Sequence, residues 1–257
     1  MSGFHGRFVW YELMTTDTAA AKAFYGEVVG WGAQDSGMPG MDYSLFTAGD
    51  AQVGGLMDLP KEAREMGMPP MWMGYVAVDD VDAGARKAKR LGGSVHVEPQ
   101  DIPGVGRFAI VADPQGASFA LYKSGSPGQD QPADAQAPGR IGWHELYAAD
   151  WEADYPFYKD LFGWEKAEAI PMGEMGTYQI FSHGGNAIGG MMTKPPTVPV
   201  PFWLYYFNVT GIDAATRRVE GAGGTIVNGP MEVPGGDWIV QGMDPQGAMF
   251  ALVGKRG

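Results

Sequence analysis

Apolar and polar residues alternate at the beginning of the chain. Residues 7–15 carry aromatic or branched side chains at alternating positions, which predicts a β-strand. Asp17 is placed to cap the helix that follows, and Gly30 is placed to end it. Between them, apolar side chains recur at a spacing of four, at Ala20, Phe24 and Val28. The pattern therefore predicts a strand followed by an amphipathic helix.

Alternating runs near 42–47 and 52–57 predict two further strands after this helix. A second strand–helix–strands unit is predicted from Trp72 to Tyr122, with its helix at about 80–91. The Asp-Pro-Gln-Gly segment before its last strand predicts a tight turn, because Asp, Pro and Gly favour the first, second and fourth turn positions. Each unit is predicted as a strand, a helix and three strands, although only two strands after the first helix alternate clearly.

The same pattern returns in the second half of the chain. Residues 6–13 (GRFVWYEL) match residues 139–146 (GRIGWHEL), and residues 113–121 (DPQGASFAL) match residues 244–252 (DPQGAMFAL). So many matches in one order indicate a tandem duplication. The first half carries four extra residues near its polar segment 60–66, which is therefore a candidate flap.

The two halves are separated by a polar segment rich in proline and glycine, without apolar periodicity, which is typical of a linker. We expect a first domain over residues 1–124, a linker over 125–138 and a second domain over 139–257. Because one chain holds both halves, we expect a monomer with an internal pseudo-dimer, or a homodimer of such chains.

Composition narrows the classes of function. The chain has 257 residues, of which 45% are apolar and 19% charged, enough to bury a core. A net charge of −12 argues against nucleic acid or an anionic membrane as a partner. The absence of cysteine excludes disulfides, thiolate metal sites and a cysteine nucleophile. The first residues lack the basic and apolar regions of a signal peptide, and no apolar stretch is long enough to span a membrane. We therefore expect no signal peptide and a cytoplasmic protein.

The order of elements, with its Asp…Phe-Tyr…Gly-Trp helix and its Asp-Pro-x-Gly turn, resembles the vicinal oxygen chelate superfamily. Glyoxalase I, bleomycin-resistance proteins and extradiol dioxygenases are members, and the chain resembles their fused two-domain form. The resemblance implies an α+β fold with four βαβββ modules, which form two tandem glyoxalase-like domains with cup-shaped sheets around a small-molecule site. It does not identify the reaction, because the superfamily includes lyases, isomerases, oxygenases and binding proteins.

In catalytic members of this superfamily, His, Gln or Glu side chains on several strands hold a divalent metal. The resemblance places those positions at six residues that offer no ligand for a hard metal: Trp10, Met73, Ala120, Trp143, Leu204 and Ala251. We therefore expect no metal cofactor in either half. The alternative is a divalent metal at a relocated site built on Glu12 and Glu145.

Strand alternation places Glu12 on the same face as Trp10, and Glu145 on the same face as Trp143. The resemblance implies that these faces line the cups. A carboxylate in an aromatic cup needs a partner or a raised pKa, so both glutamates are candidate ligand anchors. They are equally consistent with structural bracing between the halves. Aromatic residues at matched strand positions complete the predicted ligand-binding set: Tyr43, Trp72, Tyr178 and Trp203.

Three functions remain open from the sequence. The first is a metal-independent binding protein, or a weak enzyme, for a small organic molecule, as in the bleomycin-resistance branch, where the acidic anchors favour a cationic ligand. The second is a metal-dependent enzyme of the glyoxalase or dioxygenase type. The third is a non-catalytic scaffold with filled cups. The sequence identifies no catalytic residue.

Overall fold

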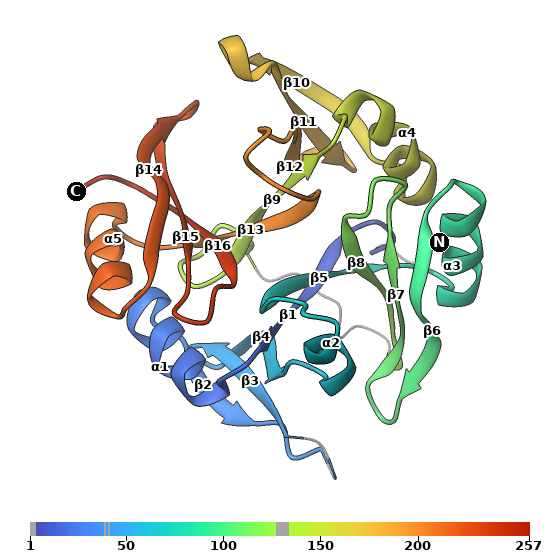
Figure 1. The fold of residues 1–257 in the computed structure, drawn as a ribbon, viewed down its shortest axis with the longest axis horizontal. Coiled ribbons are helices and arrows are strands. Elements are labelled where there is room, and N and C mark those ends of the chain that lie inside the picture. Colours follow the sequence, from blue (N-terminus) through green and yellow to red (C-terminus); the bar gives the residue numbers. More distant parts are fainter. Residues whose placement is uncertain (1–3, 39, 41, 127–133) are drawn as a thin grey trace. The chain divides into compact units, whose positions relative to one another are not determined.

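The computed structural model describes residues 4–38, 40, 42–126 and 134–257, so residues 127–133 of the predicted linker at 125–138 lie outside the described residues (Figure 1). Each half contains two βαβββ modules, which confirms the predicted α+β class and the four modules. Within the described residues, no helix combines the length and the apolar character needed to cross a bilayer.

The first half begins with a module of β1 (Phe8–Thr15), α1 (Thr18–Val29), β2 (Gly32–Asp35), β3 (Tyr43–Ala48) and β4 (Ala51–Asp58). Its second module contains β5 (Met71–Ala77), α3 (Val81–Arg90), β6 (Ser94–Ile102), β7 (Gly106–Ala112) and β8 (Ser118–Ser124). The predicted flap between them is a short exposed helix, α2 (Lys61–Glu65). The alternation pattern missed β2 because this four-residue strand is exposed along its whole length.

The second half repeats this order. Its first module contains β9 (Ile141–Ala148), α4 (Trp151–Phe162), β10 (Glu165–Pro171), β11 (Thr177–His183) and β12 (Asn186–Thr193), with a 3-10 turn η1 (Gly173–Met175). Its second module contains β13 (Phe202–Asn208), α5 (Ile212–Gly221), β14 (Thr225–Val233), β15 (Asp237–Met243) and β16 (Met249–Gly254).

Each half forms one curled sheet of eight strands. The orders are β2-β3-β4-β1-β5-β8-β7-β6 in the first half and β10-β11-β12-β9-β13-β16-β15-β14 in the second. The first strand of every module pairs in parallel with its last strand, as β1 does with β4 and β13 with β16. Because the two orders are the same, equivalent residues of the halves have equivalent strand neighbours.

The module helices begin and end where local signals predicted. The Asp17 carboxylate accepts a hydrogen bond from the backbone N–H of Ala20 at 2.9 Å, and α1 ends at Gly30, whose φ is 85°. In α4, Asp150 caps the N-terminus in the same way, and Gly163 ends the helix with a φ of 75°. Both glycines adopt the left-handed conformation that residues with a Cβ disfavour.

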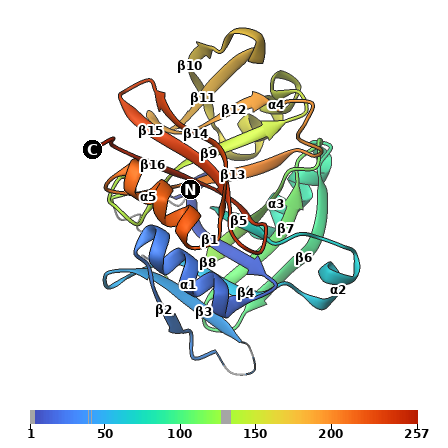
Figure 2. The ribbon, with the colours of Figure 1, turned by 60° about the vertical axis from the view of Figure 1, so that its left-hand side comes forward.

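Packing divides the chain into two compact units that do not coincide with the two halves. The mid-chain unit contains Met1–Val9, Gly74–Ala133 and Trp143–Trp203, and the chain-end unit contains Trp10–Met73, Asp134–Gly142 and Leu204–Gly257. Each unit thus combines one module from each half. Helix α1 lies beside α5 in the chain-end unit, and α3 contacts α4 in the mid-chain unit (Figure 1 and Figure 2).

The repeated motifs hold the mid-chain unit together. Tyr158 of the Phe-Tyr pair donates a hydrogen bond to Asp113 Oδ2 at 2.6 Å and accepts one from Trp203 Nε1 at 3.2 Å. The other oxygen of Asp113 accepts hydrogen bonds from the backbone N–H groups of Gln115 and Ala117. Trp164, just past the end of α4, donates to the carbonyl of Gly6 at 2.7 Å. Motifs from opposite halves therefore meet inside one unit.

The chain-end unit repeats these contacts. Tyr25 donates to Asp244 Oδ2 at 3.0 Å, and Trp72 Nε1 donates to the Tyr25 hydroxyl at 2.8 Å. Trp31 donates to the carbonyl of Gly139 at 2.7 Å. These polar groups are buried, and each satisfies a hydrogen-bonding requirement that burial would otherwise make costly.

Candidate functional site

Three side chains connected by hydrogen bonds lie on one face of the second-half sheet. Trp143 Nε1 donates a hydrogen bond to the Tyr178 hydroxyl at 2.7 Å, and this hydroxyl donates to Glu145 Oε2 at 2.9 Å. Glu145 is 5% exposed, whereas the other two side chains are half-buried. Burial raises the pKa of Tyr178 and the Glu145 charge raises it further, so Tyr178 stays protonated as the donor. The cluster combines aromatic surface with one carboxylate.

A glycine makes this cluster possible. Gly190 on β12 is the register partner of Glu145 on β9, and the Tyr178 ring lies over it from β11. A Cβ added to Gly190 would come within 2.2 Å of Tyr178 Cζ. Only a residue without a side chain lets the tyrosine cross the strand to reach the carboxylate.

The first half builds the same arrangement. Trp10 Nε1 donates to the Tyr43 hydroxyl at 3.2 Å. Gly55 is the register partner of Glu12, and a Cβ added to Gly55 would lie 1.8 Å from Tyr43 Oη. Glu12 is 9% exposed. The structure thus brings together three of the four residues predicted in each half.

The fourth predicted residue of each half lies elsewhere. On β3, Tyr43 faces Trp10, whereas Phe46 points to the opposite face, where its ring centroid lies 6.0 Å from that of Trp72. Trp72 is 5% exposed and bonded to Tyr25 of α1. Trp203 has the equivalent place beside α4. Both tryptophans belong to the core between the sheet and a helix. Strand alternation separates the two faces of a sheet but does not show which face a helix covers, so it could not predict this location.

The residues at the metal positions of the superfamily do not suit a metal. Among the described residues, no group of three or more His, Asp or Glu side chains is placed to hold one. Ala251 lies in register between Tyr206 and Gln241, and Gln241 Nε2 donates to the Tyr206 hydroxyl at 2.8 Å. This hydrogen bond spans the position where the superfamily carries a carboxylate. In the first half, Ala120 lies between Tyr75 and Ile110.

His144 is a packed residue. Its ring stacks on Phe8 with centroids 3.9 Å apart. Burial lowers the pKa of His144 to about 4, while a hydrogen bond to the Ile188 carbonyl opposes the shift. The imidazole is therefore uncharged at neutral pH.

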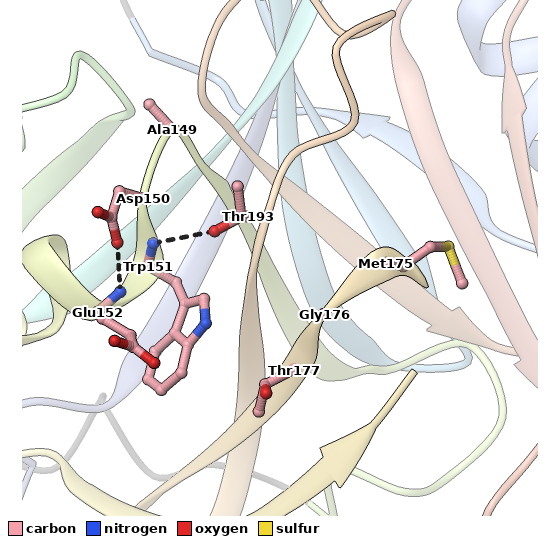
Figure 3. A pocket seen from close by; sticks show the side chains of 8 residues that line it. All are labelled: Ala149, Asp150, Trp151, Glu152, Met175, Gly176, Thr177 and Thr193. Carbon is pink, nitrogen blue, oxygen red and sulfur yellow. Dashed lines mark hydrogen bonds between the residues drawn. The ribbon is translucent and has the colours of Figure 1, made fainter. Parts of the chain in front are cut away.

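A separate hollow of about 370 Å³ lies at the start of α4 (Figure 3). Its lining includes Trp151, Glu152 and Met175, and the backbone N–H of Trp151 points to Thr193 Oγ1 at 3.5 Å. It contains none of the predicted site residues.

Sequence reasoning missed Gly55 and Gly190, which shape the clusters, and Gln241, which donates a hydrogen bond to Tyr206. Gly55 and Gly190 belong to matched Gly-Gly pairs, and their role depends on register, which the sequence does not give. Gln241 stands where the first half has Ile110, so a comparison of the two repeats position by position is the signal that would have identified it.

The sequence profile of the "Glyoxalase/Bleomycin resistance protein/Dioxygenase superfamily" matches residues 7–121 and again residues 140–252. The chain is 34% identical to the Mycobacterium tuberculosis protein named "Putative glyoxylase CFP32", over 95% of this chain and 93% of that protein. It is 32% identical to "Anthracycline biosynthesis protein DnrV" of Streptomyces peucetius, over 98% of this chain and 94% of that protein.

Solved structures share the fold at lower identity. The Mn(II)-bound glyoxalase from Novosphingobium aromaticivorans superposes with a TM-score of 0.67 at 18% identity, covering 98% of this chain and 83% of that one. The 2,3-dioxygenase LapB from Pseudomonas sp. KL28 superposes with a TM-score of 0.65 at 13% identity, covering 98% and 92%. At these identities the likeness extends to the fold alone.

Proposed function

This chain belongs to the glyoxalase/bleomycin resistance protein/dioxygenase superfamily, and from that premise we propose that it binds a small, planar organic molecule without a metal. The observation that carries the proposal is the Trp143–Tyr178–Glu145 cluster, which the first half repeats with Trp10, Tyr43 and Glu12. Aromatic rings beside a small number of fixed polar groups are typical of ligand sites.

The chemistry of the cluster favours a ligand that carries a positive charge. Glu145 is buried and accepts a directed hydrogen bond from Tyr178, which fixes its position. Aromatic rings also attract a cation that lies over their faces. The net charge of −12 attracts cations over longer distances. The name of the relative DnrV supports a planar polycyclic ligand, because anthracyclines are fused-ring molecules.

A metal-dependent enzyme of the glyoxalase or dioxygenase type is the second candidate, because a Mn(II)-bound glyoxalase shares the fold. The donor set argues against it in this chain. A hard divalent metal needs several converging oxygen or nitrogen ligands, and the superfamily positions carry Trp, Met or Leu, and Ala. A scaffold without a ligand remains the third candidate.

Fluorescence titration with daunorubicin, an amine-bearing anthracycline, and with its neutral aglycone tests the proposal. Glu145→Gln preserves an acceptor for Tyr178 but removes the charge, so we expect it to weaken daunorubicin binding by roughly 1–3 kcal/mol and aglycone binding much less. Glu168→Gln, an exposed site on β10, is the matched control and should change neither affinity. The melting temperature of each variant is measured in parallel.

Three results would count against the proposal. A lower melting temperature of Glu145→Gln with unchanged affinity would show that this carboxylate is a structural brace. Stoichiometric Mn, Fe, Ni or Zn in protein purified without chelator would favour the enzyme. Failure of the wild-type chain to bind either molecule would favour the scaffold.

A further inference from the structure

A row of polar side chains crosses the last four strands of the second half. Tyr206 on β13, Gln241 on β15 and Asn228 on β14 lie in one line of register partners, with Ala251 of β16 between the first two. Gln241 Nε2 donates to Tyr206 at 2.8 Å, and Asn228 Nδ2 donates to Gln241 Oε1 at 3.4 Å. Gln241 is 7% exposed and Asn228 is exposed. We call this line the polar row.

The first half has an apolar row at the equivalent positions. Its members, taken strand by strand from β5 to β6, are Tyr75, Ala120, Ile110 and Val97. Two further rings flank it, with centroids 6.4 Å (Phe108) and 6.2 Å (Tyr122) from that of Tyr75. Ile110 and Val97 replace the two amides of the polar row and are half-buried. The fold therefore does not require amides at these positions.

An amide on a mostly buried face is costly unless its hydrogen bonds are satisfied. The first half has Ile110 at the equivalent position and needs no such hydrogen bonds. Folding alone therefore does not explain why the second half has Gln241. The outer end of the polar row suggests a reason. Asn228 is exposed, its hydrogen bond to Gln241 is long at 3.4 Å, and its other contact, at 3.5 Å, is with the weak acceptor Met231 Sδ, so a ligand oxygen can replace both at little cost.

We propose that the two halves differ in ligand chemistry: the polar row binds carbonyl or hydroxyl oxygens on the edge of a planar ligand, and the apolar row binds an unsubstituted aromatic edge. Asn228 donates a hydrogen bond to the ligand oxygen. Gln241 positions Asn228 by accepting a hydrogen bond from it, and Tyr206 positions Gln241 by accepting one in turn. This inference rests on the proposed function in one respect, namely that the chain binds planar organic molecules.

Two probes that differ only in ring oxygens test the inference: 2-(aminomethyl)anthraquinone and 2-(aminomethyl)anthracene. Isothermal titration of the full chain should show one tighter site for the quinone. Gln241→Ile, which copies the first half, should weaken quinone binding by roughly threefold to tenfold, the equivalent of one or two neutral hydrogen bonds, and leave the anthracene unaffected. Asn228→Val should act in the same direction while leaving the Gln241–Tyr206 bond in place. The double variant Val97→Asn/Ile110→Gln should create a second tighter quinone site.

The outcomes separate the two proposals. If the wild-type chain binds both probes but Gln241→Ile and Asn228→Val change neither affinity, the inference about the rows is wrong and the proposed function stands. If the row variants weaken both probes equally, the rows do not discriminate oxygen and the inference is again wrong. If the wild-type chain binds neither probe, the proposed function fails, and the assignment of the rows fails with it.

Discussion

A buried acid in α4 gives a sharp prediction about stability. Asp154 is fully buried beside the Asp113 carboxyl group. Burial raises the pKa of Asp154 from 3.8 to about 9, and the nearby Asp113 carboxyl adds to the shift. Ala21 holds the equivalent position in the first half, so the fold accommodates a small apolar side chain there. We expect Asp154→Ala to stabilise the protein.

The size of the effect follows from linkage. A group whose pKa is higher in the folded state favours folding below its unfolded pKa, and that contribution is lost as the pH rises through the folded pKa. Between pH 3.8 and about 9, folding must return a proton to Asp154. Each pH unit in this window lowers the free energy of unfolding by about 1.4 kcal/mol, which amounts to roughly 4 kcal/mol by pH 7. After allowing for the small cavity that alanine leaves, we expect a gain of roughly 2–4 kcal/mol at pH 7.

Urea unfolding at pH 5, 7 and 8.5 measures this effect. The wild-type free energy of unfolding should fall across the series relative to Asp154→Ala, so the gain from the substitution should grow with pH. Asp160→Asn, on the exposed side of the same helix, is the control and should change little. Ala21→Asp is the mirror variant and should lose stability as the pH rises. A variant Asp154→Ala that is less stable than wild type at pH 7, or equally stable at all three pH values, would refute this reasoning.

Three further predictions follow from the packing. Tyr158→Phe removes the 2.6 Å hydrogen bond to Asp113 and should lower the free energy of urea unfolding by roughly 1–3 kcal/mol; an unchanged value would mean that the bond contributes nothing net. Gly190→Ala should displace Tyr178 and lower the free energy of urea unfolding by roughly 1–3 kcal/mol. The control Gly221→Ala, whose added Cβ meets nothing within 4 Å, should be neutral. Equal effects of the two variants would mean that the Gly190 Cβ does not clash with Tyr178. The two halves, produced separately, should lack cooperative thermal unfolding and regain it when mixed, as followed by circular dichroism; independent folding of either half would contradict the compact units.

Local signals predicted much of the fold. The caps at Asp17 and Asp150 and the glycine ends at Gly30 and Gly163 are properties of a few neighbouring residues, so the sequence displays them directly. The repeat then carried each assignment from one half to the other. The exception, β2, is short and exposed on both faces, so no hydrophobic face marks it.

Long-range partners could not be predicted in the same way. The Phe-Tyr pair and the Asp-Pro-Gln-Gly turn were visible as separate motifs, but their hydrogen bond joins Tyr158 to Asp113 across the two halves, and nothing local encodes that pairing. Alternation placed Glu145 beside Trp143, and the structure joins them through Tyr178. Ligand binding by these residues remains a prediction.

Each compact unit combines one module from each half, and this affects which halves can pair with each other. The contact that joins Tyr25 to Asp244 is the same in kind as the contact that joins Tyr158 to Asp113. If the halves were separate subunits, these contacts would not distinguish a first half paired with a second half from two copies of the same half. Both kinds of dimer would then form. Covalent connection raises the local concentration of the correct partner and enforces a one-to-one ratio. The linker thus supplies a pairing specificity that the repeated contacts lack.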